Sequence, residues 1–290
     1  MNSKLLAILG LFITQHTFAG EDVDLSKSAD SAGLIKIKNI RGDITISGWD
    51  KDEISIEGEL DDLAEKLIFE VDGKRSVIEV VMPRRNINWG DGSDLEIKLP
   101  KNSRVDFVGV STDVEVTNVL GGLRIKSVSG DVETENITGQ LMISSVSGEI
   151  KIDESEGSLH ASTVSGNLDI LRHIGGLELE SMSGDIEVNT LENDKLRIQS
   201  VSGEIDVTCD IKEGAYAELQ SISGEIELEL VGNVGAKFNL DAGISGDIDN
   251  NLSNKKASES MIGSKTLDMM TGDGSATVVI RTVSADIKVE

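Results

Sequence analysis

The sequence contains few cysteines, prolines, aromatic residues and basic residues. Among 290 residues there are one cysteine, two prolines and 3% aromatic residues. A lone Cys209 excludes an internal disulfide, and we expect it to be a small buried side chain on a strand. With 27 Lys plus Arg against 52 Asp plus Glu, the net charge of −25 argues against nucleic acid or an anionic membrane as a direct partner.

The residues that are abundant indicate a folded chain. There are 30 glycines, and 38% of the residues are hydrophobic, mostly small or β-branched. A disordered acidic tail would have fewer Val, Ile and Leu residues and more prolines. This composition favours thin, repetitive layers over a bulky globular interior.

Residues 1–19 have the layout of a secretory signal peptide. Lys4 is followed by an apolar run from Leu5 to Ile13 and then by the sequence Thr17-Phe18-Ala19. The run is too short to span a membrane stably, and no later stretch is long and apolar enough to do so. We expect cleavage after Ala19 and a mature chain, not membrane-spanning, that resides in the periplasm or outside the cell.

An internal repeat dominates the rest of the chain. Its core is Ser-Gly followed by an acidic residue and an aliphatic one, and its glycines lie 18, 18, 18, 19, 21 and 22 residues apart. We assign turn and ladder roles to the serine and glycine of each copy: Ser129, Gly130, Ser147, Gly148, Ser165, Gly166, Ser183, Gly184, Ser202, Gly203, Ser223, Gly224, Ser245 and Gly246.

The repeat predicts an all-β fold, a single-stranded parallel β-solenoid (β-helix) with coils of about 18 residues. Val128, Gly130 and Val132 share one parity, which we expect to face inward, while Ser129 and Asp131 face outward. The glycine is expected where a Cβ would collide with the opposite wall or forbid the required φ. Parity leaves open whether a coil has two or three faces.

The flanks depart from the repeat and divide the mature chain into three parts. Residues 20–109 predict a β-rich N-terminal cap, residues 110–250 the solenoid, and residues 251–290 a loop insertion followed by closing strands. Solenoid ends expose open strand edges, so both flanks have a capping role.

These features together resemble the DUF4097 family of β-strand-repeat proteins. The resemblance is carried by the segments Arg41 to Asp50, Leu95 to Pro100 and Val105 to Val110, followed by the Ser-Gly-Asp/Glu ladder. It implies a solenoid on an exported or envelope-facing protein, a type often labelled "putative adhesin". It implies no established chemistry and no functional residues.

Carboxylates form the most conspicuous candidate site. The outward parity predicts a column of acidic side chains, and its weak candidates for a metal site are Asp131, Glu149, Asp185, Glu204, Glu225 and Asp247. Ca²⁺ suits such oxygen ligands, but a solvated, salt-screened face is the simpler interpretation, so we predict no cofactor.

Other candidate residues favour structural roles. Equivalent serines without an adjacent base do not form a nucleophilic site, so we predict no catalytic residues. His160 and His173 are expected to be exposed turn residues rather than a metal pair. Trp49 and Trp89 could bind a sugar but are more often core.

The sequence therefore predicts a non-enzymatic envelope protein, a rigid acidic rod used for binding, adhesion or scaffolding, whose partners are envelope proteins or glycans. A polysaccharide-active parallel β-helix enzyme and a divalent-cation-binding surface protein are the alternatives, and an ice-binding solenoid ranks last.

Overall fold

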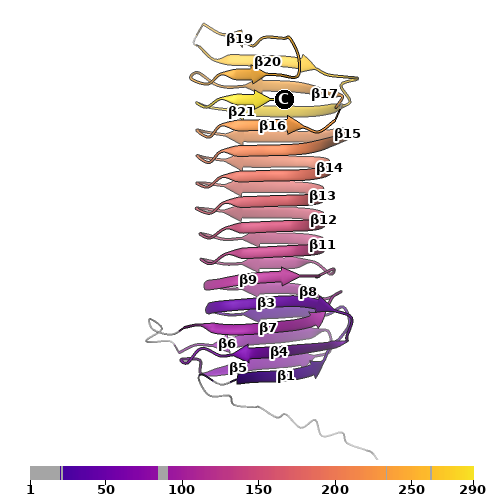
Figure 1. Ribbon diagram of the computed structural model, residues 1–290, viewed down its shortest axis with the longest axis vertical. Helices are drawn as coiled ribbons and strands as arrows, with labels where there is room; N and C mark the ends of the chain where they lie inside the picture. The colour runs from indigo at the N-terminus through magenta and orange to yellow at the C-terminus, as the bar shows by residue number, and fades with distance from the viewer. Residues whose placement is uncertain (1–19, 21, 84–90, 233, 262) are drawn as a thin grey trace, which may run out of the picture.

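The computed structural model describes residues 20, 22–83, 91–232, 234–261 and 263–290, and within these ranges it contains strands but no helix (Figure 1). The strands that precede and begin the repeats are β1 (Asp22–Ser28), β2 (Leu34–Lys38), β3 (Arg41–Trp49), β4 (Glu53–Glu59), β5 (Lys66–Asp72), β6 (Arg75–Val81), β7 (Ser93–Pro100), β8 (Arg104–Val108), β9 (Ser111–Thr117) and β10 (Leu123–Lys126). The long repeat strands are β11 (Val132–Ser144), β12 (Ile150–Thr163), β13 (Leu168–Ser181), β14 (Ile186–Ser200) and β15 (Ile205–Ser221). The remaining strands are β16 (Ile226–Leu230), β17 (Ala236–Asp241), β18 (Ile248–Asn250), β19 (Ser258–Glu259), β20 (Lys265–Met270), β21 (Ala276–Thr282) and β22 (Ile287–Val289).

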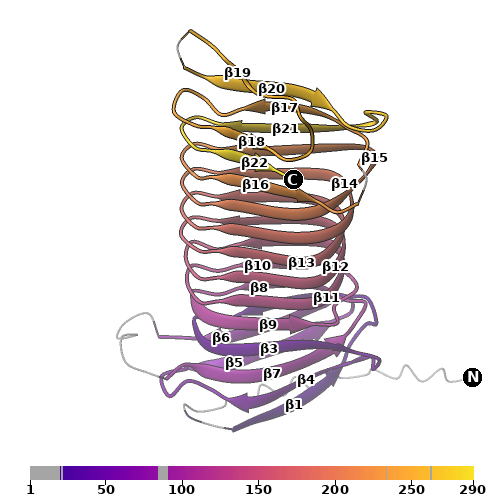
Figure 2. The ribbon, with the colours of Figure 1, turned by 45° about the horizontal axis from the view of Figure 1, so that its top comes forward.

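The predicted parallel solenoid is confirmed, and each coil has two faces. The first half of β12 pairs in parallel with the first half of β13, and the second halves pair likewise. Because each long strand bends round a corner between its halves, the coils stack as two layers, as Figure 2 shows. The stack is long and mostly parallel, and it does not close into a barrel.

We name the two faces by their side chains, described below. The acidic face consists, in spatial order, of β1, β4, β7, β3, β9, the first halves of β11–β15, β16, β22 and β18. The mixed face consists of β5, β6, β2, β8, β10, the second halves of β11–β15, β21, β17, β20 and β19.

The core is a narrow apolar layer between the two faces. Val132, Ile150 and Leu168 stack along the acidic face, and Leu141 and Leu159 stack along the mixed face, all 3% exposed or less. Stacking equivalent residues buries in one continuous core an apolar surface that a single coil could not bury.

The predicted inward parity fails in the turn that precedes each glycine. Val128 is 48% exposed, whereas its neighbour Ser127 is only 7% exposed. The Ser127 hydroxyl points inward and donates to the carbonyl oxygen of Ser129, so the chain reverses and Val128 faces solvent. The inward positions therefore begin at Val132, and alternation does not continue through the turn.

Both ends of the rod are closed by strands that insert out of sequence order. At the N-terminal end, β2 and β3 lie between the pair β6–β7 and the pair β8–β9. At the other end, β21 lies between β15 and β17, and β22 pairs with both β16 and β18. The coil of Gly246 is thus separated from that of Gly224 by the closing strands.

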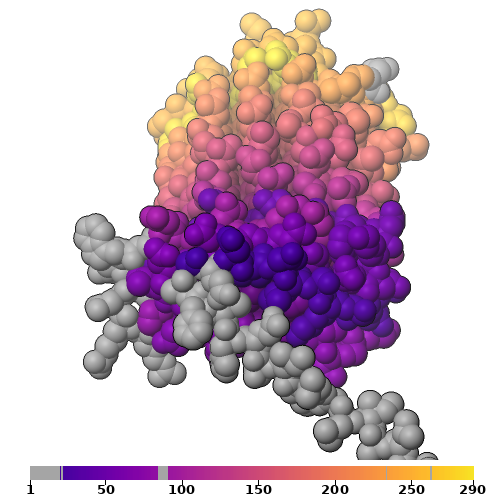
Figure 3. Space-filling model, turned by 60° about the horizontal axis from the view of Figure 1, so that its bottom comes forward, coloured from indigo at the N-terminus to yellow at the C-terminus, as the bar shows by residue number. Residues whose placement is uncertain are grey.

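Antiparallel strands complete each end. β1, β4 and β5 join the N-terminal end, where indigo and purple residues form the base in Figure 3. β20 pairs antiparallel with β17 and β19, and between β18 and β20 the chain is mostly irregular, where we expected a loop or hairpin.

Candidate binding surface

The repeat glycines lie where neighbouring coils approach most closely. A Cβ on Gly166 would lie 2.8 Å from the carbonyl carbon of Gly148, and one on Gly203 would lie 2.5 Å from that of Gly184. The obstacle is the backbone of the adjacent coil and not the opposite wall. Gly130 and Gly148 also have positive φ values of 99° and 109°. Glycine is needed at these turns mainly for close stacking.

The repeat serines form hydrogen bonds between coils. The hydroxyls of Ser129 and Ser147 donate to the carbonyl oxygens of Val110 and Val128, and Ser202 donates to Met182 in the same way. A second hydroxyl column, which the sequence reasoning missed, is buried beneath the turns: Ser127, Ser145, Thr163, Ser181, Ser200, Ser221 and Thr282.

Two columns of carboxylates run along the acidic face from end to end. Every position of the first column is acidic except Asn167: Asp22, Glu59, Asp94, Asp43, Asp113, Asp131, Glu149, Asn167, Asp185, Glu204, Glu225, Asp286 and Asp247. The second column is interrupted by a threonine and two lysines: Asp24, Glu57, Glu96, Thr45, Glu115, Glu133, Lys151, Asp169, Glu187, Asp206, Glu227, Lys288 and Asp249.

Part of the first column is held by the backbone. Asp113 accepts a 2.8 Å hydrogen bond from the backbone N–H of Asp131, and Asp131 accepts one of 2.8 Å from Glu149. Asn167 and Asp185 accept equivalent bonds of 3.0 Å from the next coil. These shorter side chains thus have a structural role that accounts for Asp and Asn in the repeat.

Burial and neighbouring carboxylates together raise the pKa of two acidic side chains on this face, Glu204 and Asp206. Burial raises the pKa of Glu204, and the charges of Glu225 and Asp185 raise it further. Burial, followed by the charges of Glu227 and Glu229, raises the pKa of Asp206. A positive charge beside Glu204 and Asp206 would relieve the part of this shift that comes from neighbouring carboxylates.

The six candidate metal ligands lie along one exposed column. Asp131, Glu149, Asp185, Glu204 and Glu225 follow one another, with Asn167 in between, but Asp247 is separated from them by Asp286. Asp247 is 2.8 Å from Lys265, and this contact lowers its pKa. Among the described residues, no three His, Cys, Asp or Glu side chains are arranged to hold a metal ion.

His160 and His173 occupy different environments. His160 lies on the mixed face, with its Nδ1 3.8 Å from Glu178. His173 was expected to be exposed but is 1% exposed, and its Nδ1 lies 2.8 Å from the Ser155 hydroxyl. Burial lowers the pKa of His173. The Ser155–His173 pair resembles a nucleophile and its base, but both side chains are buried in the stack.

The remaining candidates are structural. Cys209 is buried, as expected, and burial raises its pKa to about 12, so its thiol is unreactive. Trp49 is half-buried, donates to the carbonyl oxygen of Glu53 and lies under the Lys51 ammonium, 4.3 Å from its ring centroid. Trp89 lies outside the described residues.

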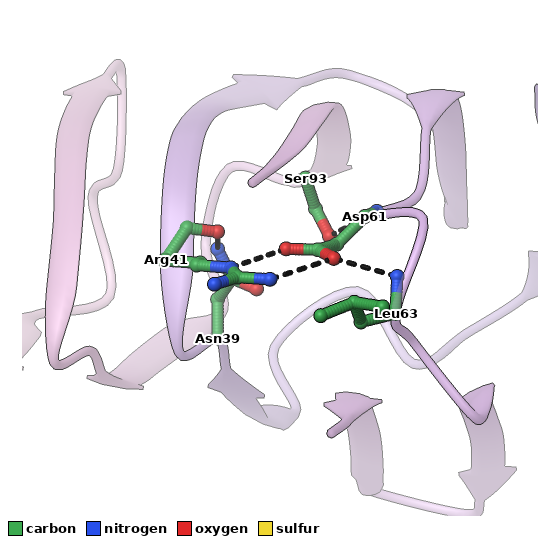
Figure 4. A network of polar contacts seen from close by, with 5 residues as sticks. All are labelled: Asn39, Arg41, Asp61, Leu63 and Ser93. Carbon is green, nitrogen blue, oxygen red and sulfur yellow. Dashed lines mark hydrogen bonds and ion pairs between the residues drawn. The ribbon is translucent and has the colours of Figure 1, made fainter. Parts of the chain in front are cut away.

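A buried ion pair at the N-terminal end was not predicted (Figure 4). The Arg41 guanidinium, at the start of β3, forms a two-point contact with the Asp61 carboxylate, which also accepts the Leu63 N–H. The Ser93 hydroxyl accepts the Asp61 N–H. Hydrogen bonding from Arg41 lowers the pKa of Asp61. Because Arg41 begins β3 and Asp61 lies in the connection after β4, this ion pair joins the inserted strand to that connection.

Comparison with known families identifies the fold. The profile of the family described as Toastrack DUF4097 matches residues 34–290. The chain belongs to this family. The match includes both inserted ends of the Toastrack chain as well as its regular coils. Among curated proteins, none matches the sequence.

Three solved structures are similar to this Toastrack chain over most of their length. A putative adhesin from Bacteroides fragilis is 12% identical, with 93% of this chain and 97% of that one covered and a TM-score of 0.40. A putative lipid binding protein from Parabacteroides distasonis is 13% identical, with coverage of 95% and 98% and a TM-score of 0.38. A putative cell adhesion protein from Clostridium sporogenes is 11% identical, with coverage of 93% and 99% and a TM-score of 0.24.

In the part of the Toastrack chain that the structure describes, no helix is long and apolar enough to cross a bilayer.

Proposed function

We propose that this Toastrack chain is an exported, non-enzymatic protein of the cell envelope, and that its rigid acidic face is a binding surface for adhesion or scaffolding. The observation that carries the proposal is the pair of carboxylate columns, which continue from β1 to β18 on one face only. Its place of action is the periplasm or the cell exterior, with residues 1–19 as the export signal.

The two faces differ in a way that supports this role. On the mixed face, Arg197 lies between Glu178 and Glu218 at 3.9 and 3.8 Å, so opposite charges alternate and neutralise one another. On the acidic face, carboxylates mostly neighbour carboxylates. Many weak contacts along such a column add up through effective concentration when the partner is itself repetitive or extended.

The test compares envelope binding by the mature chain and by two charge variants. The acidic-face variant carries Glu133→Gln, Glu187→Gln and Glu204→Gln, none of which accepts a backbone N–H from the next coil. The control carries Glu156→Gln, Glu192→Gln and Glu213→Gln, three exposed positions at the corner between the faces. Both variants lose three charges.

Co-sedimentation with purified envelope fractions and with isolated cell-wall glycan provides the measurement. We expect the unsubstituted chain and the control to sediment with at least one of them, and the acidic-face variant to sediment at least threefold less. The proposal is contradicted if all three proteins sediment equally, or if none of them sediments. Release of soluble sugar from the glycan would instead support the polysaccharide-active alternative.

A further inference from the structure

One edge of the rod carries a continuous line of exposed aliphatic side chains. They occupy the position two residues before each repeat glycine, or before Thr112 and Ala285, which stand in the place of that glycine, in the stack of tight turns visible beside the layers in Figure 1. We call them the apolar ladder: Val110, Val128, Val146, Val164, Met182, Val201, Ile222, Val283 and Ile244, each between 38% and 63% exposed. The inward parity expected of Val128 predicts a core position for the equivalent side chain of each repeat, and the structure instead exposes it.

The ladder is rigid because consecutive members lie on hydrogen-bonded coils. The N–H of Ser129 donates to Val110, that of Ser147 to Val128, and that of Ser165 to Val146. At the C-terminal end, Ser284 N–H donates to Ile222, which places Val283 next in line. Nine half-exposed aliphatic side chains together expose on the order of 600 Å², an area at the upper end of what a monomer ordinarily shows.

A hollow of about 380 Å³ accompanies the middle of the ladder. Val164, Met182 and Val201 line it together with Glu180 and Gln199. Ser181, also in its lining, has a buried hydroxyl oxygen without a hydrogen-bond partner. The ladder is therefore not a uniform ridge, because it offers a recess with apolar and polar walls into which a partner side chain could fit.

Charge distinguishes the two flanks of the ladder. On the side of the acidic face, the residue three positions after each member is a carboxylate, as in Asp131 after Val128, except for Asn167 after Val164. The corresponding flank on the mixed face has both signs and neutral residues, with Lys126, Glu180 and Arg281 among them. The surface is thus an apolar stripe with a negative border on one side.

We propose that the apolar ladder and its acidic border bind an amphipathic basic helix of a partner protein, whose apolar stripe lies along the ladder and whose Lys or Arg residues face the first carboxylate column. This proposal deepens the function proposed above and rests on it. It names the chemistry of the partner and moves the main contact from the acidic face to its edge.

The dimensions of the ladder suit a helix. Coils about 4.8 Å apart place the nine members over about 38 Å, which corresponds to a helix of about 25 residues. One helical turn of about 5.4 Å is close to the spacing between coils, whereas same-face residues of an extended chain are about 6.8 Å apart.

Charge disfavours the other occupants. A second copy carries the same net charge of −25, and an antiparallel pair would place acidic border against acidic border. An anionic lipid surface is repelled by the same border. A basic helix is the occupant for which both the apolar stripe and its border are favourable.

The experiment uses the mature chain and two fluorescent 25-residue peptides, an amphipathic Leu/Lys helix and its Leu/Glu counterpart. The ladder variant carries Val164→Ser, Met182→Ser and Val201→Ser, and the border variant carries Glu204→Gln and Glu225→Gln. The control variant carries Ile174→Ser and Leu191→Ser, exposed aliphatic residues at the opposite corner. Single Met182→Gln replaces the ladder variant if circular dichroism shows that the triple substitution unfolds the chain.

Fluorescence anisotropy measures Kd for each pair at low and at high salt. We expect the Leu/Lys peptide to bind the unsubstituted chain and the control equally, and the Leu/Glu peptide not to bind. The ladder variant should weaken binding at least tenfold at both salt concentrations (at least threefold for Met182→Gln alone), and the border variant about threefold at low salt only.

Three outcomes overturn the proposal: no binding of the Leu/Lys peptide, equal binding by the ladder variant, or ladder-dependent association with a second copy or with phosphatidylcholine vesicles in place of peptide. Sedimentation velocity and vesicle flotation detect the last two. Sedimentation of the ladder variant with envelope fractions separates the two proposals. If one of the three outcomes is observed and this variant still sediments, the proposed function stands while the helix-binding proposal falls.

Discussion

Substituting the repeat glycine in the middle of the rod tests whether close coil stacking limits the fold. In Gly203→Ala, the new Cβ would lie 2.5 Å from the carbonyl carbon of Gly184 and 3.1 Å from the backbone nitrogen of Asp185. Ordinary contacts need at least 3.4 Å, and the Cβ would lie closer still to the carbonyl oxygen of Gly184, so the two coils must separate locally by at least about 1 Å. Backbone atoms cannot move aside as a flexible side chain can.

The hydrogen bonds that this separation stretches determine the magnitude. Near Gly203 they include Ile186 N–H to Glu204 at 2.9 Å, Glu204 N–H to the Asp185 carboxylate at 3.0 Å, and Val201 N–H to Ser181 at 3.2 Å. At about 1 kcal/mol for each bond, and with about 1 kcal/mol of overpacking, we expect a loss of about 4 kcal/mol in the free energy of unfolding.

Gly176→Ala is the matched control, because the nearest atom to its Cβ is 3.9 Å away and its φ is not positive. It should change stability by less than about 1 kcal/mol, since alanine only restricts the unfolded chain. Urea unfolding followed by circular dichroism, with hydrogen exchange at the Ile186 amide, whose bond to Glu204 crosses the separating coils, as a local probe, measures both variants. If the two variants differ by less than 1 kcal/mol, coil stacking does not explain the glycine.

Three further predictions concern charge. Asp61→Asn takes the carboxylate away from the buried side of Arg41, and should lower the free energy of unfolding by about 3 kcal/mol in urea titrations, whereas an exposed acid such as Glu156→Gln should have almost no effect. Because the folded-state pKa of His173 lies below its unfolded value of 6.5, the unfolded chain binds the extra proton, so stability should fall as pH falls below 6.5. His173→Asn should remove that part of the pH dependence in calorimetric scans from pH 7 to pH 5, and an unchanged profile would contradict it. Raising NaCl from about 20 to about 500 mM should raise Tm, because it screens the carboxylate columns, and CaCl₂ at equal ionic strength should raise it further only if the columns bind the ion specifically.

The regular coils could be predicted from the sequence because each coil repeats the same order of turn, acidic and apolar residues. The period of about 18 residues brings Val132, Ile150 and Leu168 into register, and the acidic positions after each glycine then follow as a column. The alternation could not predict the exposure of Val128, because a turn interrupts the period of two. That side chain faces solvent once the Ser127 hydroxyl bonds to the turn carbonyl.

The ends could not be predicted, because the chain order there differs from the spatial order. Nothing local in β21 indicates that it will lie between β15 and β17, since any strand with the same alternation could pair there. The Arg41–Asp61 contact likewise depends on bringing β3 beside a connection that lies beyond β4. Long-range polar pairs of this kind have no periodic signature in the sequence.

The insertion at each end also explains how an open parallel stack is held together where it is weakest. A terminal coil that followed its predecessor in simple order would have a neighbour on one side only, and would fray first. Here β22 forms hydrogen bonds with β16 on one side and β18 on the other, and β3 with β7 and β9. The first and last regular coils of the chain are therefore internal to the rod, and the strands that remain outermost are short or antiparallel. Because the two ends fix the stack, the carboxylate columns and the apolar ladder between them keep constant spacing, which a surface needs in order to bind an extended partner at many points at once.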